Sequence, residues 1–256
     1  MGAANIRAVT EAAGIIVHSA FERPGSPAIG RDAGEAAGLA PLGIVIGDDP
    51  EAALVGADAI IDFTGPAVSV MLSELAAARG LVDIIGTTGC SKEEDWAIQK
   101  AGKAGARIVK TGNFSLGVNM LAGLVGQVAA ALPDYDVEIL EMHHNRKVDA
   151  PSGTALLLGR AAAKARGEEF DQNAVLSREG HTGPRRRGSI GFATLRGGNV
   201  IGEHTVYFVG ETERIEISHR ATDRGMFAAG AVRAALWAKD QPPGFYDMAD
   251  VLGLKQ

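Results

Sequence analysis

Short apolar runs alternate with helical stretches through the first half of the chain. The apolar runs have the length of buried strands and occupy residues 15–21, 43–46, 59–63, 81–85 and 107–110. Residues 68–79 and 92–103 have helical composition, and Ser91 with Glu94 has capping-box spacing where the second of these helices begins. This alternation predicts a parallel sheet wrapped by helices, which is an α/β domain.

The pattern changes after Asn113. Helices are expected over residues 116–132 and 154–166, a strand over 136–144, further strands over 190–196, 200–209 and 213–218, and a helix over 225–238. The sequence Gly-Gly-Asn at 197–199 is typical of a hairpin turn joining the strands on either side of it. We therefore expect a first domain of residues 1–113 with 224–256, and an α+β domain of residues 114–223.

Composition narrows the class of protein. The 256 residues are 46% hydrophobic and 22% charged, with a net charge of −6, which argues against a general nucleic-acid binder. No stretch approaches the roughly 20 apolar residues that span a bilayer, so we expect no membrane partner. Cys90 is the only cysteine, which agrees with a cytoplasmic location, where thiols stay reduced.

The richest chemistry lies where a predicted strand runs into a predicted helix. This segment brings together two imidazoles, a lysine and the expected helix start: His143, His144, Lys147, Gly153 and Thr154. Backbone N–H groups at a helix start bind carboxylates, helped by the helix dipole. Histidine exchanges protons near neutral pH, and the lysine can assist it or donate a proton itself. The combination predicts a site that grips an anion and moves a proton.

Simpler interpretations of the same residues compete with this one. Arg146 and Lys147 alone would be read as a basic loop in solvent. The adjacent pair His143 and His144 should point to opposite faces of a strand, so the two rings would not chelate one metal ion, and we expect no metal site. The combination of imidazoles, lysine and helix start favours the binding site over the solvated loop.

Several ordered motifs resemble one family. The run HHNRKVDAPSGTA at 143–155 is similar to the signature of 4-hydroxy-tetrahydrodipicolinate reductase, also called dihydrodipicolinate reductase. Six more matches occur in order: IDFT at 61–64, GTTG at 86–89, NFSLGVN at 113–119, SREGHTG at 177–183, GFAT at 191–194 and GEHT at 202–205. The resemblance extends from Ile6 to the end of the chain.

This resemblance implies a fold and an activity. The fold would be a Rossmann-type nucleotide-binding domain plus an α+β substrate-binding and tetramerisation domain with a mixed open sheet. The activity would be the reduction of 4-hydroxy-tetrahydrodipicolinate or dihydrodipicolinate to tetrahydrodipicolinate with NADPH or NADH, in the diaminopimelate route of lysine biosynthesis. The substrate is a small dicarboxylate, and the strands of residues 189–218 would build the interface of a homotetramer.

The resemblance also implies residue roles. His143 matches the family's proton donor and acceptor, and Lys147 the residue that supplies or relays the proton. His144, Gly153 and Thr154 match the positions that hold the substrate's carboxylates. The cofactor positions fall in three places: Gly86, Thr87 and Thr88 along the cofactor, Thr111, Gly112, Asn113 and Phe114 near the nicotinamide, and Glu22 with Arg23 where a strand ends. A carboxylate there takes ribose hydroxyls and an arginine takes a 2′-phosphate, which suits either nucleotide.

The beginning of the chain departs from the family's pattern. A dinucleotide-binding domain should open with a strand and a glycine-rich loop, but this sequence starts MGAANIR, which looks like the tail of that loop. We expect the missing strand and loop to weaken cofactor binding and leave two strand edges unpaired.

Two alternatives to this reductase remain open. One is a catalytically weak relative that binds a dicarboxylate or assembles without efficient use of cofactor. The other is a different two-domain dehydrogenase, although such an enzyme would need a nucleophilic cysteine in the middle of the chain, and only Cys90 is available.

Overall fold

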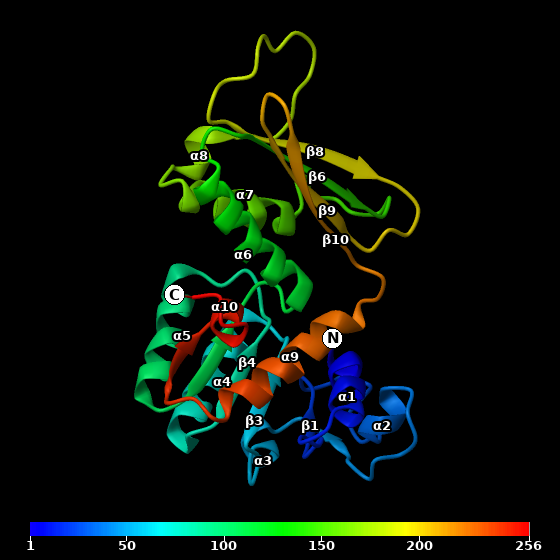
Figure 1. Cartoon of the computed structure of the whole chain (residues 1–256). Coiled ribbons are helices and arrows are strands. Elements are labelled where there is room, and N and C mark those ends of the chain that lie inside the picture. Colours follow the sequence, from blue (N-terminus) through cyan, green and yellow to red (C-terminus); the bar gives the residue numbers. More distant parts are fainter. Residues whose placement is uncertain (256) are drawn as a thin grey trace. The chain divides into compact units, whose positions relative to one another are not determined.

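The computed structural model describes residues 1–255. Its contacts divide the chain into two compact units (Figure 1). Unit 1 joins Met1–Leu116 to the segment that starts at Gly225, and unit 2 is Gly117–Arg224. Within the described residues, no helix combines the length and the apolar character needed to cross a membrane.

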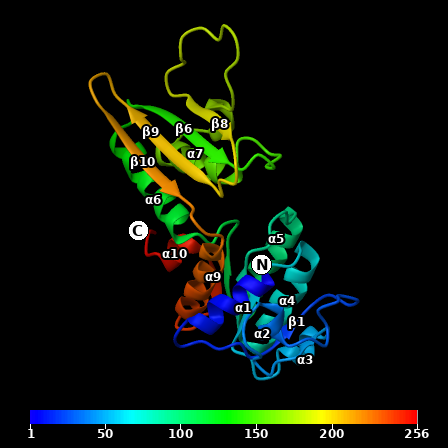
Figure 2. The same ribbon diagram turned by 90° about the vertical axis from the view of Figure 1, so that its right-hand side faces the viewer.

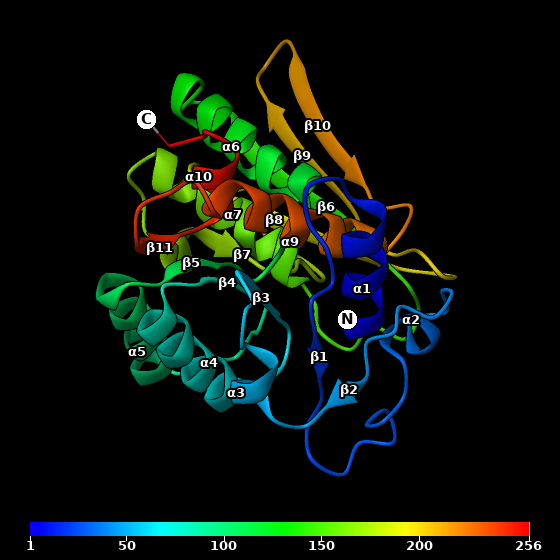
Figure 3. The same ribbon diagram turned by 90° about the horizontal axis from the view of Figure 1, so that it is seen from below.

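Unit 1 is built on a four-stranded parallel sheet. Its strand order is β11-β5-β4-β3, with the bounds β3 (Ala59–Asp62), β4 (Val82–Ile85), β5 (Arg107–Lys110) and β11 (Gly244–Tyr246). Residues from α4 (Pro66–Arg79) and α5 (Lys92–Ala104) pack against one face of this sheet. The other face carries α9 (Gly225–Ala238) and α10 (Met248–Val251), and Figure 3 shows the two layers. The predicted parallel sheet wrapped by helices is confirmed.

A second, two-stranded sheet in unit 1 departs from the prediction. It pairs β1 (Ala20–Phe21) with β2 (Ile46–Gly47) in parallel, near the short helices α2 (Ala33–Ala36) and α3 (Pro50–Ala53) and the longer α1 (Gly2–Glu11). The strand expected over residues 15–21 is wrong for its first five residues, which pair with no strand in the described chain. An apolar run becomes a strand only where a neighbouring strand completes its backbone hydrogen bonds. Residues 15–19 have no such neighbour among the described residues, and the side chain of Ile16 is not buried in the core but 81% exposed.

Unit 2 is a five-stranded mixed sheet covered on one face by helices (Figure 2). The strand order is β10-β9-β6-β8-β7, with the bounds β6 (Asp136–His143), β7 (Ala174–Val175), β8 (Ile190–Arg196), β9 (Glu203–Val209) and β10 (Arg214–Arg220). Its helices are α6 (Leu116–Ala131), α7 (Gly153–Ala165) and α8 (Phe170–Asn173). Apolar side chains of α6 and α7 form one core with the alternate residues of β6, among them Val137 and Ile139.

The hairpin predicted at residues 197–199 is wrong. β8 and β9 do not pair, because β6 lies between them, parallel to β8 and antiparallel to β9. The connection instead crosses the end of β6, where the Gly197 N–H donates to the carbonyl of His143 (2.9 Å) and the Asn145 N–H donates to that of Gly198 (3.3 Å). This crossing brings the end of β8 and the start of β9 to either side of His143.

Candidate active site

Glu141 is the centre of a buried polar cluster at the end of β6. Strand alternation carries Val137, Ile139, Glu141 and His143 to the helix-covered face, so this carboxylate is only 1% exposed. Its oxygens accept hydrogen bonds from four partners: the His143 ring, the Arg196 guanidinium, the Ser152 N–H and the Thr194 hydroxyl. A buried carboxylate needs such partners, and here both oxygens have them.

Arg196 meets Glu141 as a two-pronged fork. Its Nη1 lies 2.8 Å from Oε2 and its Nη2 3.0 Å from Oε1, while Nη2 also donates to the carbonyl of Asp149 (2.7 Å). Burial acts to raise the pKa of Glu141, but the hydrogen bonds from Arg196 and His143 outweigh it and the net shift is downward. Glu141 is therefore an anion at neutral pH.

His143 makes its ring contacts inside this cluster. Its Nδ1 lies 2.5 Å from Oε2 of Glu141, and an ionised carboxylate can only accept, so Nδ1 carries a hydrogen. Nε2 lies over the backbone of Gly202, where a Cβ would come within 3.0 Å of it. Because Nδ1 is bonded to Glu141, Nε2 is the ring nitrogen of His143 that can exchange a proton.

Ser152 ties the cluster to the start of α7. Its hydroxyl caps the helix by accepting from the Ala155 N–H (3.1 Å), and it lies 3.0 Å from Nε2 of His204. Burial, assisted by the nearby His143, lowers the pKa of His204 to about 4, so this ring is neutral at physiological pH. The His204 ring packs edge-on against His143 with centroids 5.1 Å apart, which supports the orientation of His143.

The remaining predicted residues of this region lie in the loop from β6 to α7 and at the first turn of α7. Lys147 Nζ contacts both oxygens of Asp149 (2.7 and 2.9 Å), and the pKa of Asp149 is lowered chiefly by that contact. The pKa of His144 is also lowered, first by burial and then by the positive charges of Arg146 and others nearby. Gly153 and Thr154 begin α7 at the positive end of its dipole, which makes this region suited to an anion.

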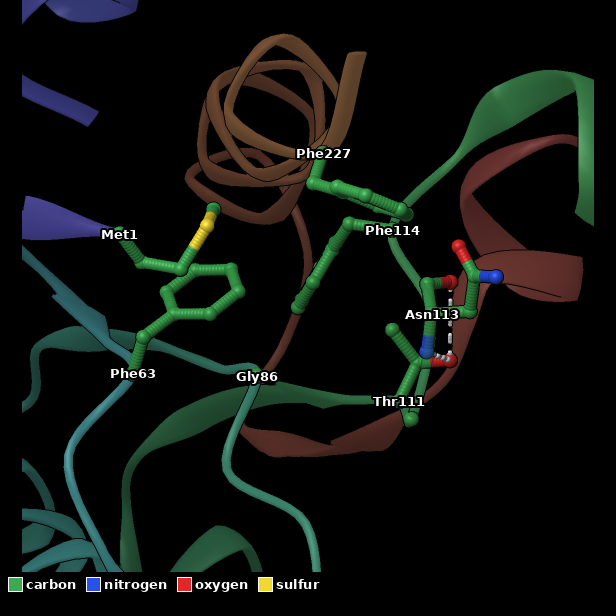
Figure 4. Close-up of a pocket in the computed structure, with 8 residues that line it drawn as sticks. Met1, Phe63, Gly86, Thr111, Asn113, Phe114 and Phe227 are labelled. Atoms are coloured by element: carbon green, nitrogen blue, oxygen red, sulfur yellow. Dashed lines mark hydrogen bonds between the residues drawn. The ribbon is translucent and has the colours of Figure 1, made fainter. Parts of the chain in front are cut away.

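Most of the predicted cofactor residues lie in or beside one pocket, and two lie elsewhere. A pocket of about 180 Å³ in unit 1 is shown in Figure 4, and it is lined by Met1, Phe63, Gly86, Thr111, Gly112, Asn113, Phe114 and Phe227. Five of these were predicted from the sequence, whereas Met1, Phe63 and Phe227 were not. Thr87 lies beside the pocket, 5% exposed, and Thr88 is exposed in the same loop. Glu22 and Arg23 lie elsewhere, exposed in the turn after β1.

The pocket lies at the carboxyl ends of the parallel strands. Phe63 follows β3, Gly86 follows β4 and Thr111 follows β5, and this edge is where open α/β sheets bind ligands. The rings of Phe63 and Phe114 lie 5.6 Å apart, and the Thr111 hydroxyl receives the N–H of Asn113 (3.2 Å), which fixes the turn. In the described residues, no cluster of three or more histidine, cysteine or acidic side chains could hold a metal ion.

A ligand pocket at the edge of a parallel sheet, with an imidazole–carboxylate pair on a separate mixed sheet, defines a two-domain oxidoreductase of the dinucleotide-dependent class. Two family models match the chain, "Dihydrodipicolinate reductase, N-terminus" over residues 1–114 and "Dihydrodipicolinate reductase, C-terminus" over residues 117–252. The chain therefore belongs to the dihydrodipicolinate reductase family, as the sequence motifs indicated.

Several similar proteins carry names from the same family. The 4-hydroxy-tetrahydrodipicolinate reductase of Allorhizobium ampelinum is 59% identical over 99% of this chain and 94% of its own length. That of Rhizobium rhizogenes is 58% identical over 99% of this chain and 93% of its own length. Among solved structures, the dipicolinate-bound dihydrodipicolinate reductase from Paenisporosarcina sp. TG-14 has a TM-score of 0.74 at 21% identity, covering 95% of this chain and 92% of that one. That likeness confirms the fold. None of these findings favours a catalytically weak relative over the enzyme.

Proposed function

We propose that this chain reduces 4-hydroxy-tetrahydrodipicolinate or dihydrodipicolinate to tetrahydrodipicolinate with NADPH or NADH, in the diaminopimelate route to lysine. The relatives at 54–59% identity carry the name of this enzyme. The solved relative from Paenisporosarcina is described as dipicolinate-bound, and dipicolinate is a flat ring with two carboxylates. Residues 114–223 would bind the substrate, and residues 1–113 with 224–256 would bind the nucleotide.

The observation that carries the proposal is the Glu141–His143 pair beside the start of α7. An imidazole with Nδ1 occupied by a carboxylate has Nε2 committed to proton exchange. The helix start and the cations around it suit a dicarboxylate. One region of unit 2 thus provides an anion site and a proton donor, and the reaction requires both from the protein.

The residues of the chain then have separate tasks. When bound, reduced nicotinamide would supply a hydride to a carbon conjugated with the ring imine of dihydrodipicolinate. The 4-hydroxy substrate would first lose its hydroxyl group as water to give that conjugated ring. His143, in its protonated form, donates the proton that converts the resulting enamine to the product, and Glu141 stabilises the positive ring beforehand. Lys147 supplies or relays that proton, while His144 with Gly153 and Thr154 holds the carboxylates.

The pocket in unit 1 fits a nicotinamide ring. Its aromatic side chains, Phe63, Phe114 and Phe227, suit the apolar face of such a ring, and the main chain of Thr111–Asn113 offers polar groups for a carboxamide edge. Gly86 leaves no room for a side chain, because an added Cβ would come within 2.2 Å of the Phe63 ring. Together with Thr87 and Thr88 these residues would hold the nicotinamide end, and Glu22 with Arg23 would meet the adenosine ribose or its 2′-phosphate.

An assay of the purified chain tests the proposal. With the cyclic substrate and reduced nucleotide present, the near-ultraviolet absorbance of the nucleotide should fall, and it should stay constant when the substrate is left out. Calorimetric titration with NADPH and NADH should show binding of at least one of them. Nucleotide binding without any substrate-dependent oxidation would contradict the proposed reaction.

We further propose a homotetramer working in the cytoplasm. The sheet face of unit 2 that points away from α6 and α7 carries partly exposed apolar residues, including Leu195, which is 47% exposed, and Leu140 and Met142. Covering this face with another copy would remove them from water. Sedimentation equilibrium should then give four times the mass of one chain, and a monomer mass would contradict the tetramer.

A further inference from the structure

Ser69 of α4 links the ends of two neighbouring strands. Its side chain is fully buried, and its hydroxyl touches the carboxylate of Asp62, the last residue of β3. The same oxygen lies 2.8 Å from the hydroxyl of Thr87, two residues beyond the end of β4. Asp62 is 1% exposed and Thr87 5% exposed, so the bridge is shielded from water.

The direction of each hydrogen in this bridge follows from the donors available. A carboxylate only accepts, so the Ser69 hydroxyl donates to Asp62, and the Thr87 hydroxyl must then donate to Ser69. The other Asp62 oxygen accepts from the N–H and the hydroxyl of Thr64 (2.8 and 2.6 Å). One buried carboxylate thus orients the hydroxyls that follow both β3 and β4.

Main-chain contacts reinforce the link between the two loops. The Gly86 N–H donates to the carbonyl of Asp62 (2.8 Å), and the Phe63 ring lies against the Gly86 backbone. Phe63 and Gly86 both line the pocket shown in Figure 4. The conformations of the loops 62–64 and 86–88 therefore depend on each other. Together the two loops form one wall of the pocket.

We infer that Asp62 and Ser69 are positioning residues for the nicotinamide nucleotide, acting through Thr87 on the loop of residues 86–88. This inference rests on the proposed function, in which that loop lies along the cofactor. Both side chains are too deeply buried to touch a ligand, so their effect reaches it only through the loop they hold. Nucleotides bind beyond the carboxyl ends of parallel strands, which is the edge these residues organise.

Ser73 provides a matched control on the same helix. It lies one turn beyond Ser69, is equally buried, and also bonds to an acidic side chain of the sheet, the carboxyl group of Asp83 (3.0 Å). Asp83 lies inside β4, away from the loop that follows the strand. Removing either hydroxyl therefore costs buried hydrogen bonds, but only Ser69 reaches the pocket wall.

The test compares Ser69→Ala with Ser73→Ala in the full chain. Because two bridging bonds are lost, Ser69→Ala should raise KM for the reduced nucleotide about ten-fold. Its kcat and its KM for the dicarboxylate should stay within about two-fold of the wild type. Ser73→Ala should lower the melting temperature similarly and leave the nucleotide KM unchanged. Equal nucleotide KM values in the two variants would overturn the inference.

A milder variant guards against loss of folding. Thr64 is exposed, so Thr64→Val should fold normally while losing one bond to Asp62, and nucleotide KM should rise about three-fold. If the wild type shows no substrate-dependent oxidation, the proposed reaction fails. Calorimetric NADPH and NADH affinities of Ser69→Ala and Ser73→Ala then still decide the role of Ser69, and equal affinities would count against it.

Discussion

Oε2 of Glu141 lies 2.5 Å from Nδ1 of His143 in the interior of unit 2. Arg196 holds the same carboxylate with a two-pronged contact, which keeps Glu141 ionised and leaves it unable to donate. The ring of His143 therefore has a fixed orientation and a fixed hydrogen on Nδ1. Proton donation by His143 from Nε2 depends on this contact.

Glu141→Gln should lower kcat by about 100-fold, because a neutral amide no longer stabilises the protonated ring and can donate to the wrong nitrogen. Glu138→Gln is the control, since Glu138 lies on the same strand facing the other side, where it binds Arg178 and Arg185. Steady-state kinetics of both variants checks the prediction. A kcat of Glu141→Gln equal to that of Glu138→Gln would show that the carboxylate does not support His143.

His204 should make the protein less stable in acid. Burial lowers its pKa from 6.5 to about 4. In the unfolded chain His204 therefore becomes protonated as the pH falls below 6.5, whereas in the folded chain it stays neutral until about pH 4. Between about pH 7 and pH 5, the wild type should lose about 2 kcal/mol more unfolding free energy than His204→Gln. Urea unfolding at the two pH values measures this difference, and parallel losses in both proteins would refute the assignment.

Asp83 should have the opposite pH dependence. Burial, and then the charge of Asp62, raise its pKa well above 3.8, so the folded chain keeps the proton at pH values where the unfolded chain has released it. Its contribution therefore becomes more unfavourable as pH rises above 3.8. Asp83→Asn, which does not titrate, should therefore be more stabilising, relative to the wild type, near pH 7 than near pH 4. A variant equally stabilised, or destabilised, at both pH values would contradict this.

Gly230 should be intolerant of a side chain. A Cβ there would lie 1.8 Å from the carbonyl oxygen of Phe114, so Gly230→Ala must push α9 away from the pocket segment and should cost about 3 kcal/mol. Gly126→Ala in α6 is the matched helical control, because its Cβ would meet nothing closer than 3.9 Å. It should stabilise the chain by about 1 kcal/mol. Thermal unfolding compares the two, and a Gly230→Ala protein as stable as the wild type would be unexpected.

The sequence predicted three strands of the unit 1 sheet, β3, β4 and β5, because their short apolar runs are buried in part or, for β4, along the whole strand, but it did not predict β11. It also predicted β8 and α9 with the observed bounds, 190–196 and 225–238. The hairpin after β8 failed because turn residues mark where a chain turns, and not which strand it pairs with next. The insertion of β6 between β8 and β9 is a non-local choice that no local pattern encodes.

The site was predicted in part for a similar reason. His143, Lys147 and the start of α7 are contiguous in sequence, so their association could be inferred. Glu141 and Arg196 were missed, since they meet across two strands that are paired only in the fold. A usable signal existed, because alternation from Val137 and Ile139 places Glu141 on the buried face, where a carboxylate requires partners.

The role of His143 as proton donor is tested by kcat of His143→Gln at saturating substrate and reduced nucleotide. If His143 donates the proton, kcat should fall by at least about 100-fold. Nucleotide affinity, measured by calorimetry, should be unchanged, since the pocket proposed for the nucleotide lies in unit 1. A His143→Gln enzyme that turns over at the wild-type rate would show that His143 does not donate the proton.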